Sequence, residues 1–265
     1  MTRTVDISFI IPTYRRPAFL SEALASILEL TSLAIEVSVV DDSPDGEGAQ
    51  VVNSFNDPRI RYTQREVPSE GRPAKLRNQA AAQALGSVLY FLDDDDLVQT
   101  DALAGAFAEL QQSRSGVLIS IPEPFGEVPD KVRSEVAFFD RARTKLALMP
   151  SSVSLAAHLI FRDSLVTCSA CLIKRTTFAA IGGFDESIPL AEDVDFYSRA
   201  IAADGYVLTD RRFARRRVGQ PSMIAQPNRD ELDDSYSQMR EGFRKRNGTL
   251  AYFMYRVKHK LQRDV

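Results

Sequence analysis

The sequence of 265 residues contains no tryptophan, only two cysteines and two histidines, and its charge is nearly balanced. Two cysteines cannot build a disulfide-rich scaffold, and such a low number is typical of a reducing compartment. The 33 basic and 36 acidic residues leave a net charge of −3, whereas a nucleic-acid-binding domain is usually strongly basic. The composition therefore excludes a small disulfide-stapled protein and argues against nucleic acid as a partner.

Long apolar runs are also missing. No segment approaches the roughly 18 uninterrupted apolar residues that a membrane-spanning helix needs. The N-terminus, MTRTVDISFIIPTY, has neither the apolar core nor the small-residue cleavage site of a secretory signal. The 44% of hydrophobic residues still allow a substantial core. We therefore expect a cytoplasmic globular protein without a membrane span.

Strand-like and helix-like segments alternate through the first half of the sequence. Apolar and β-prone runs predict strands at 7–11, 35–40, 59–64, 87–92 and 116–121. Apolar residues at helical spacing predict helices between them, at 16–30, 47–55, 73–85 and 101–112. This alternation predicts an α/β fold with a mostly parallel sheet and helices on both faces. Ligands of such sheets bind at the carboxyl ends of the strands.

The second half of the sequence is less regular. Residues 122–163 show no pattern that assigns them to helices or strands. Beyond them we predict strands at 166–174 and 206–213 and helices at 175–181 and 192–203. From residue 228 onward the pattern is helical and highly charged. The fold of the second half is therefore predicted in less detail than that of the first.

Four consecutive carboxylates follow the predicted strand 87–92, at Asp93, Asp94, Asp95 and Asp96. A helix cap needs one aspartate, and four neighbouring charges repel one another unless a counter-charge is present. A hard divalent cation such as Mg²⁺ or Mn²⁺ would supply that charge through oxygen ligands. On these residues alone a capping turn remains open, and together with the rest of the chain the cluster favours a metal site.

Two further acidic clusters lie at the ends of predicted elements. Asp41 and Asp42 follow the strand 35–40, where a carboxylate can accept a hydrogen bond from a nucleotide, although a plain Asp-Pro-Gly turn explains them equally. Glu192 and Asp193 begin a predicted helix, where acids complement the helix dipole. A carboxylate at such a place can instead serve as a general base. Spacing alone leaves both alternatives open.

Together with other motifs, and in this order, the three clusters resemble those of the family 2 glycosyltransferases, which have the GT-A type nucleotide-sugar fold. The resemblance covers roughly residues 8–222. Besides the acidic clusters, it rests on the opening Ser8-Phe9-Ile10-Ile11-Pro12-Thr13-Tyr14-Arg15-Arg16, on Arg77-Asn78-Gln79-Ala80, and on Gly183-Phe184-Asp185-Glu186. The ordered set is specific for the family and much less so for the substrate.

The resemblance implies roles for the residues of the donor site. Pro12, Thr13 and Tyr14 would line the pocket for the base and ribose, together with Arg16 of the same motif. Asp42 would accept a hydrogen bond from the base, and Arg72 or Lys75, with Arg77 nearby, would lie near the base or diphosphate. Asp93 would contact the ribose or metal-bound water, and Asp95 would bind the metal, Mn²⁺ or Mg²⁺. Asp94 stands at the family's variable position within this donor site, and Asp96 would support the turn.

The resemblance also implies the reaction. Asp193 would be the catalytic base, with Glu192 helping to place the acceptor, in a single displacement that inverts the anomeric carbon. The donor would be a UDP-sugar or, second, a dTDP-sugar, and the acceptor a glycan, a lipid-linked molecule or a small molecule, as in cell-surface glycan synthesis. The runner-up is a non-catalytic nucleotide-sugar-binding or partner subunit. We expect a nucleotide-sugar-binding half at 1–121, an acceptor-side half with the catalytic base at 122–227 of the same domain, and a basic helical C-terminus at 228–265.

The sequence departs from the family pattern in one segment. Related enzymes often carry a histidine shortly before a serine near the diphosphate, whereas residues 215–222 read Arg-Arg-Arg-Val-Gly-Gln-Pro-Ser. An arginine of 215–217 could neutralise the diphosphate instead, since guanidinium binds phosphate in a bidentate manner. A solvated basic loop explains the segment equally.

Three other features are open to a structural explanation. Cys168 and Cys171 have redox-like spacing but lack the second pair of a zinc site, so we expect two structural thiols. His158 is expected to be a packed or surface side chain. Residues 240–264 contain eight basic and two acidic residues around an apolar run, Leu250–Tyr255 in the printed sequence. Such a helix can pack on the domain with a solvated charged face, which is the interpretation we favour. The alternative is peripheral contact of 240–265 with an anionic membrane.

Overall fold

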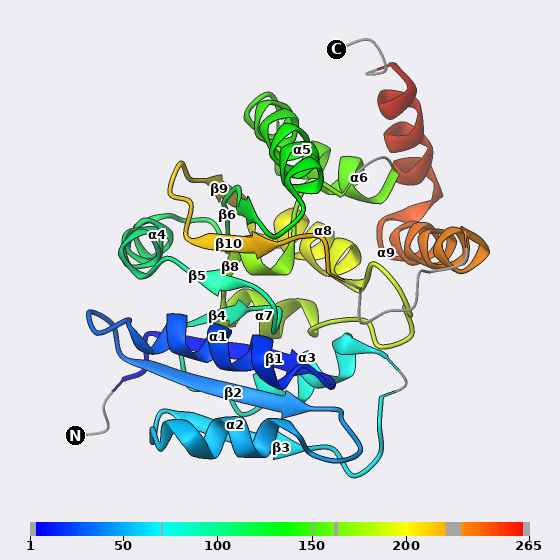
Figure 1. The fold of residues 1–265 in the computed structure, drawn as a ribbon. Coiled ribbons are helices and arrows are strands. Elements are labelled where there is room, and N and C mark those ends of the chain that lie inside the picture. Colours follow the sequence, from blue (N-terminus) through cyan, green and yellow to red (C-terminus); the bar gives the residue numbers. More distant parts are fainter. Residues whose placement is uncertain (1–3, 70, 150, 162–163, 221–228, 262–265) are drawn as a thin grey trace.

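The structure is a computed structural model that describes residues 4–69, 71–149, 151–161, 164–220 and 229–261. Within these residues the main sheet has seven strands in the order β3-β2-β1-β4-β8-β6-β9 (Figure 1). The strands are β1 Ile7–Thr13, β2 Ile35–Asp41, β3 Ile60–Gln64, β4 Val88–Phe91, β6 Val117–Ile119, β8 Cys171–Lys174 and β9 Tyr206–Leu208.

The direction of the strands brings their carboxyl ends to one edge of the sheet. β1 is parallel to β2 and β4, β2 is parallel to β3, and β6 is parallel to β9. β8 is antiparallel to both of its neighbours, β4 and β6. The expected α/β fold is confirmed, with β8 as the exception to a mostly parallel sheet. Thr13, Asp41 and the acidic residues after Phe91 therefore lie at the same edge.

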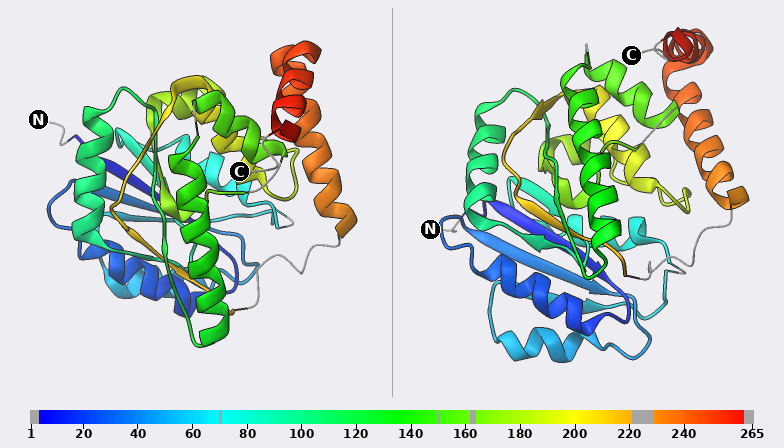
Figure 2. Two further views of the ribbon diagram at one scale, coloured as in Figure 1. Left: turned by 90° about the horizontal axis from the view of Figure 1, so that it is seen from above. Right: turned by 45° about the horizontal axis from the view of Figure 1, so that its top comes forward.

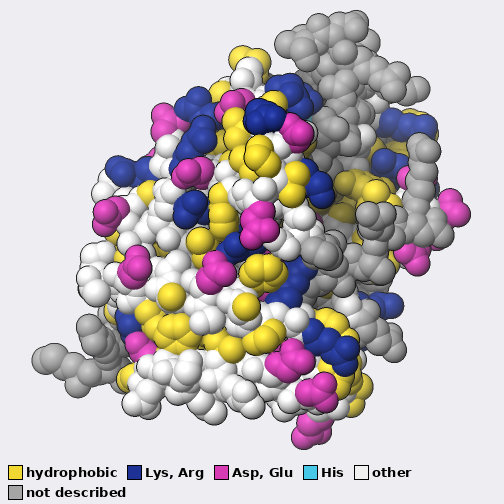
Figure 3. Space-filling view, viewed as in Figure 1, with side chains coloured by type: hydrophobic (Ala, Val, Ile, Leu, Met, Phe, Trp, Pro, Cys, Tyr) yellow, Lys and Arg dark blue, Asp and Glu magenta, His cyan; other side chains and the backbone are white. Residues whose placement is uncertain are grey.

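Helices cover both faces of this sheet, because successive strand side chains point to opposite faces. Phe9 and Ile11 belong to one core, which is covered by α1 (Pro17–Leu28), α2 (Gly48–Phe55) and α4 (Thr100–Gln112). Ile10 belongs to the other core, which is covered by α3 (Pro73–Ala81), α5 (Pro129–Ala147), α6 (Ser152–Phe161) and α8 (Glu192–Asp204). On the face drawn in Figure 3, basic and acidic side chains are interspersed.

A second, small sheet lies beside the carboxyl edge. Its strands, β5 (Leu97–Val98), β10 (Ala214–Arg217) and β7 (Glu123–Phe125), follow the order β5-β10-β7. β10 is antiparallel to β5 and parallel to β7. Because β5 directly follows the four aspartates, this sheet holds the Arg215–Arg217 segment against them.

Two strand predictions are wrong in their extent. The expected strand at 166–174 begins with a 3₁₀ turn, Cys168–Ala170, followed by β8 (Cys171–Lys174) and α7 (Arg175–Ile181). The turn lets the Ser169 hydroxyl accept a hydrogen bond from the Asp93 N–H and its carbonyl accept one from Tyr90. The expected strand at 206–213 ends at Leu208, because the chain leaves the main sheet there and joins the small sheet as β10. Local strand propensity could not predict the contacts of the 3₁₀ turn with β4 and the aspartate loop, or the pairing of β10 in the small sheet.

The C-terminal region is helical, as predicted. α9 (Arg229–Leu261) is interrupted at Gly248, whose φ of 82° and ψ of 159° break the helical path. Figure 2 shows the two halves, in orange and red, at an angle to each other. Among the described residues, no helix combines the length and apolarity that a membrane span requires.

Candidate active site

A cavity of about 750 Å³ opens at the carboxyl edge of the main sheet. It is lined by segments far apart in the sequence: the end of β1, residues 68–69 and 71–73, the four aspartates, α5, the start of α8, and the end of β10. It brings together these residues expected from the sequence: Pro12, Thr13, Tyr14, Arg16, Asp42, Arg72, Asp93, Asp94, Asp95, Glu192 and Asp193. Lys75 of α3 is not among the residues that line it.

All four aspartates line the cavity, but two of them are buried and hold the loop, whereas the other two keep more exposure. Asp94 and Asp96 are buried, with exposed fractions of 1% and 3%. Asp94 accepts a hydrogen bond of 2.7 Å from the Thr13 hydroxyl, and Asp96 accepts one of 2.8 Å from the Arg217 N–H. Asp93 and Asp95 keep more exposure, 40% and 21% of their side chains. The structural pair therefore leaves the other two carboxylates for a ligand.

Burial and mutual repulsion disfavour the ionised form of the carboxyl groups in this loop. Burial raises the pKa of Asp94 to about 7, and burial with repulsion from Asp93 and Asp95 raises the pKa of Asp96 to about 8. Burial and repulsion from Asp93 also raise the pKa of Asp95. Arg16 offsets part of this repulsion, with its Nη1 2.8 Å from Asp95 Oδ2 and 3.4 Å from Asp94 Oδ1.

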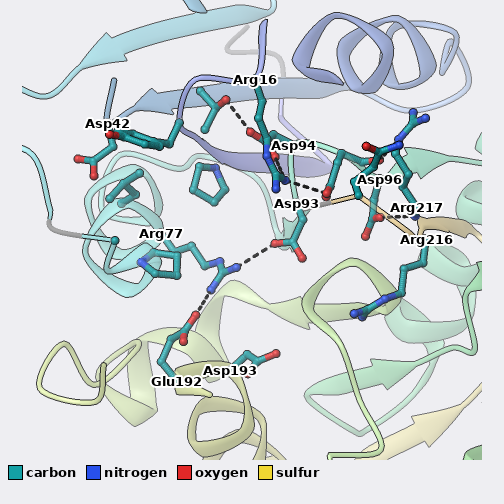
Figure 4. A pocket seen from close by; sticks show the side chains of 18 of the residues that line it. Arg16, Asp42, Arg77, Asp93, Asp94, Asp96, Glu192, Asp193, Arg216 and Arg217 are labelled. Atoms are coloured by element: carbon teal, nitrogen blue, oxygen red, sulfur yellow. Dashed lines mark hydrogen bonds and ion pairs between the residues drawn. The ribbon is translucent and has the colours of Figure 1, made fainter. Parts of the chain in front are cut away.

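Arg77 joins the aspartate loop to the start of α8. Its Nη2 donates to Asp93 Oδ1 at 2.9 Å, and its Nη1 donates to Glu192 Oε1 at 2.5 Å (Figure 4). The side chain is buried, and its guanidinium lies 5.4 Å from the centre of the Phe184 ring. Its Nε has no hydrogen-bond partner among the described residues. Sequence reasoning placed Arg77 near the donor and missed this bridge.

The neighbouring residue on α3 fixes the same segment by its backbone. Asn78 Nδ2 donates to the Phe184 carbonyl, and its Oδ1 accepts from the Phe184 N–H, both at 2.9 Å. The sequence shows the Arg77-Asn78 pair on a predicted helix, but nothing in it indicates that the acidic clusters at 93–96 and 192–193 meet there. The two side chains together tie residues 184–192 to the donor side of the molecule.

The start of α8 is held in a strained geometry. Ala191 precedes the helix with φ 55° and ψ 32°, a left-handed conformation that costs a non-glycine residue about 1–2 kcal/mol. This turn directs Glu192 and Asp193 towards the cavity (Figure 4). Burial and repulsion from Glu192 raise the pKa of Asp193 to about 7, although Arg77 opposes the shift. A carboxylate with such a pKa can exchange a proton near neutral pH.

Asp42 lies directly after β2, in the wall of the cavity that is formed by the strand ends. Its Oδ1 accepts a hydrogen bond of 2.8 Å from the Ser69 N–H, and its Oδ2 accepts one of 2.7 Å from the Ser69 hydroxyl. Arg65 Nε lies 3.4 Å from the same carboxylate. Asp41 does not line the cavity and accepts hydrogen bonds from Ser43, Gly48 and Tyr62. Of the two strand-end aspartates, Asp42 is therefore the one that can reach a ligand.

The three arginines of β10 have different surroundings. Arg217 is fixed by the Asp95 carbonyl at 2.9 Å and by Glu22 at 2.6 Å. Arg215 packs 4.5 Å from the centre of the Phe125 ring and does not line the cavity. Arg216 lines the cavity, and its Nε lies 4.0 Å from Glu135 Oε2 (Figure 4). Arg217 lines the cavity too, but its hydrogen bonds hold it in place, so Arg216 is the better candidate to contact a ligand. Residues 221 and 222 of the departing segment lie outside the described residues.

Comparison with known proteins now identifies the family. The family model described as "Glycosyl transferase family 2" matches residues 8–168. The chain belongs to glycosyltransferase family 2.

Two curated relatives show the range of this family. The poly(ribitol-phosphate) beta-N-acetylglucosaminyltransferase TarS of Staphylococcus aureus (strain MW2) is 30% identical over 227 residues, which is 82% of this chain and 36% of TarS. A GalNAc(5)-diNAcBac-PP-undecaprenol beta-1,3-glucosyltransferase of Campylobacter jejuni is 33% identical over 108 residues, which is 40% of this chain and 33% of that protein. The chain thus spans about a third of the length of these relatives.

Solved structures of glycosyltransferases have a similar fold. S. aureus TarS 1-349 in complex with UDP-GlcNAc has a TM-score of 0.71 at 20% identity, covering 94% of this chain and 69% of that chain. The mannosyltransferase PcManGT of Pyrobaculum calidifontis, in complex with GDP-Man and Mn²⁺, has a TM-score of 0.64 at 20% identity, covering 94% and 66%. The GT-A type fold expected from the sequence is therefore confirmed.

The wall formed by α5 contains residues that sequence reasoning missed. Lys131, Ser134 and Glu135 line the cavity from one face of this helix. They lie in the segment 122–163, which resisted assignment. Their spacing of three and four residues is the signal that could have placed them on a common helix face.

The remaining candidates have structural surroundings. Cys168 and Cys171 are buried free thiols, as expected, although Cys168 lies in the 3₁₀ turn and not in a strand. His158 is buried on α6 with an exposed fraction of 5% and does not line the cavity, which confirms it as a packed side chain.

Proposed function

We propose that this family 2 chain transfers a sugar from a nucleotide-diphosphate donor to an acceptor hydroxyl, with inversion at the anomeric carbon. The observation that carries the proposal is the bridge through Arg77. It holds the aspartate loop at the end of β4 and the Glu192-Asp193 pair at the start of α8 on one cavity. A donor-binding carboxylate set and a carboxylate with a pKa near 7 thereby share one site.

The donor would bind along the carboxyl edge of the sheet. Pro12, Thr13, Tyr14 and Asp42 offer the wall for the base and ribose, and Arg72 lies at the same end of the cavity. A UDP-sugar is the first candidate, supported by the UDP-GlcNAc complex of the TarS structure. A dTDP-sugar is the second.

The residues present fit a divalent cation. Asp95 and Asp93 offer hard oxygen ligands at the cavity. Burial, with repulsion from Asp93, raises the pKa of Asp95, so a cation bound there would stabilise the ionised carboxylate. Among the described residues, no group of three histidine, cysteine or acidic side chains is arranged to hold a metal ion by itself. Magnesium sites often use one or two carboxylates together with substrate phosphates. A bound Mn²⁺ or Mg²⁺ would neutralise charge that develops on the leaving diphosphate.

The chain's own residues would perform the transfer. As the acceptor oxygen bonds to the anomeric carbon, the bond between that carbon and the diphosphate oxygen breaks, and Asp193 takes the hydroxyl proton. Glu192, held by Arg77, would keep Asp193 and the acceptor in position. Arg216 would donate hydrogen bonds to the diphosphate, in the place where related enzymes often carry a histidine.

The acceptor is proposed to be a glycan or a lipid-linked molecule, with a small molecule as the alternative. The names of the relatives support this class, since one acts on poly(ribitol-phosphate) and another on an undecaprenol-linked glycan. The α5 wall, with Lys131, Ser134 and Glu135, is the proposed acceptor side of the cavity.

Calorimetric binding of UDP, dTDP and GDP, each with and without Mn²⁺, tests the donor site. We expect one nucleotide to bind the wild type in the presence of Mn²⁺ and to lose this metal-dependent binding in Asp95→Asn. Asp45→Asn, an exposed aspartate outside the cavity, is the matched control. Equal binding of all nucleotides to both variants, independent of metal, would contradict the proposal.

A further inference from the structure

The second half of α9 presents an apolar stripe to the outside. Leu250, Phe253, Met254 and Val257 are exposed by 76%, 54%, 65% and 54%. Their spacing of three, four and seven residues places them on one face of the helix. Exposed apolar residues scattered singly are ordinary, but a continuous helical stripe indicates a contact surface.

The opposite face of the same half-helix fixes it to the body of the protein. The Tyr252 ring lies 5.4 Å from the Phe161 ring of α6, and the Tyr255 ring lies 5.2 Å from the Phe243 ring before the break. The break at Gly248 turns this half-helix away from the first half of α9 (Figure 2). The stripe therefore belongs to a helix with a defined orientation.

Basic charge is concentrated in the same segment. Residues 240–264 contain eight basic and two acidic residues, a net charge of +6. Since the whole chain has a net charge of −3, the rest of the chain carries −9. Arg256, between Phe253 and Val257 in the sequence, is exposed. The apolar stripe thus lies on a strongly basic segment of a chain whose remaining residues carry a net negative charge.

We propose that this stripe and its basic flanks bind the surface of an anionic lipid bilayer. An interfacial helix inserts its apolar side chains at the headgroup boundary, while Lys and Arg are attracted to anionic lipids. A second copy that docks the same segment against this one is disfavoured, because two segments of +6 would repel each other. The inference goes beyond the proposed function, since it concerns a surface outside the cavity.

An ion pair links the first half of α9, before the break at Gly248, to α8. Asp195 is fully buried on α8, two residues after Asp193, and its Oδ1 lies 3.0 Å from Arg246 of α9. Its Oδ2 accepts a hydrogen bond of 2.7 Å from Arg199. A bilayer bound by α9 would therefore have a fixed position relative to the helix that begins with Glu192 and Asp193.

Co-sedimentation of the full chain with lipid vesicles tests the proposal. The vesicles are phosphatidylcholine alone, or phosphatidylcholine and phosphatidylglycerol in equal parts. The double variant Leu250→Ser/Met254→Ser removes two residues of the stripe. The matched control, Leu85→Ser/Leu148→Ser, replaces two leucines of similar exposure, 64% and 66%, outside it. Circular dichroism and the sedimentation coefficient of each variant establish its fold and its state of association.

We expect the wild type and the control to bind the anionic vesicles and to bind phosphatidylcholine alone much more weakly. The stripe variant should bind the anionic vesicles at least tenfold more weakly, because two apolar side chains no longer insert. Equal pelleting of the wild type and the folded stripe variant would overturn the proposal. Self-association of the wild type that the stripe variant abolishes, without vesicle binding, would overturn it in favour of a second copy.

Discussion

The two walls of the cavity are built in different ways. The proposed donor wall comes from short motifs at the ends of the neighbouring parallel strands β1, β2 and β4. Each motif directly follows its strand, and the parallel strands bring the motifs together in space. The opposite wall combines α5, β10 and the start of α8, which lie far apart in the sequence. Arg77 joins the two walls through two carboxylates, and Arg217 adds contacts between β10 and the aspartate loop. The residues of the first wall are therefore placed by the strands that they follow. Those of the second wall are placed by tertiary contacts between α5, β10 and α8.

The junction itself should give the largest effect on stability. Arg77→Met leaves the buried Glu192 without its partner, so we expect a loss of about 3–5 kcal/mol in the free energy of unfolding, measured by urea denaturation. The double variant Arg77→Met/Glu192→Gln should recover a large part of this loss. A cost below about 1 kcal/mol in Arg77→Met, similar to that of an exposed surface substitution, would show that the walls do not depend on the bridge.

The pH dependence of sugar transfer tests the proposed base in the second wall, Asp193. Asp193 must be ionised to accept a proton, and burial with repulsion from Glu192 and Asp93 raises its pKa to about 7, against the opposing effect of Arg77. We therefore expect kcat/KM to rise with pH up to about 7 and to be roughly 100-fold lower at about pH 5. The measurement is the pH profile at saturating metal. A rate that stays level from pH 5 to 7 would contradict the assignment.

Arg216 should contribute to donor binding from the second wall. Removing a charged hydrogen-bond donor typically costs about 1.5–3 kcal/mol, so Arg216→Ala is expected to raise the KM for the donor about tenfold or more. Arg215→Ala, on the same strand but outside the cavity, is the control and should leave this KM unchanged. Equal effects of the two variants would assign the arginines to the fold and not to the donor.

The α5 wall should give the smallest effect, confined to the acceptor. Lys131→Ala and Ser134→Ala remove groups that line the cavity, and we expect a several-fold rise in the KM for the acceptor with an unchanged KM for the donor. Arg133→Ala on the same helix, 71% exposed, serves as the control. Steady-state kinetics with both substrates varied makes the distinction. A change in donor KM alone would move α5 to the donor side.

The order of elements in the first half could be predicted because its strands are continuous apolar runs. The acidic loop was visible because four adjacent carboxylates at a strand end are unusual. The family resemblance already assigned Asp93 and Asp95 to a ligand and Asp96 to the turn. The sequence could not show the contacts behind this division, which are the hydrogen bonds that Asp94 accepts from Thr13 and that Asp96 accepts from Arg217.

The second half was less accessible for a physical reason. The 3₁₀ turn at Cys168–Ala170 and the strand β10 are fixed by contacts with the aspartate loop, and not by local propensity. The helix α5 has cavity-lining residues of unrelated types, which form no recognisable motif. The bridge through Arg77 was missed because a buried arginine between two acidic clusters can only be recognised once the clusters are known to meet.

The most direct test of the central claim is a comparison of Asp193→Asn with the wild type in sugar transfer and in nucleotide binding. The matched control is Asp101→Asn, an exposed aspartate in the first turn of α4. We predict that Asp193→Asn lowers kcat by about 10²–10⁴-fold while UDP binding in the presence of Mn²⁺ remains within about twofold of the wild type. Transfer within a few fold of the wild type, by a variant that still binds the nucleotide, would contradict the claim that Asp193 is the base of this site.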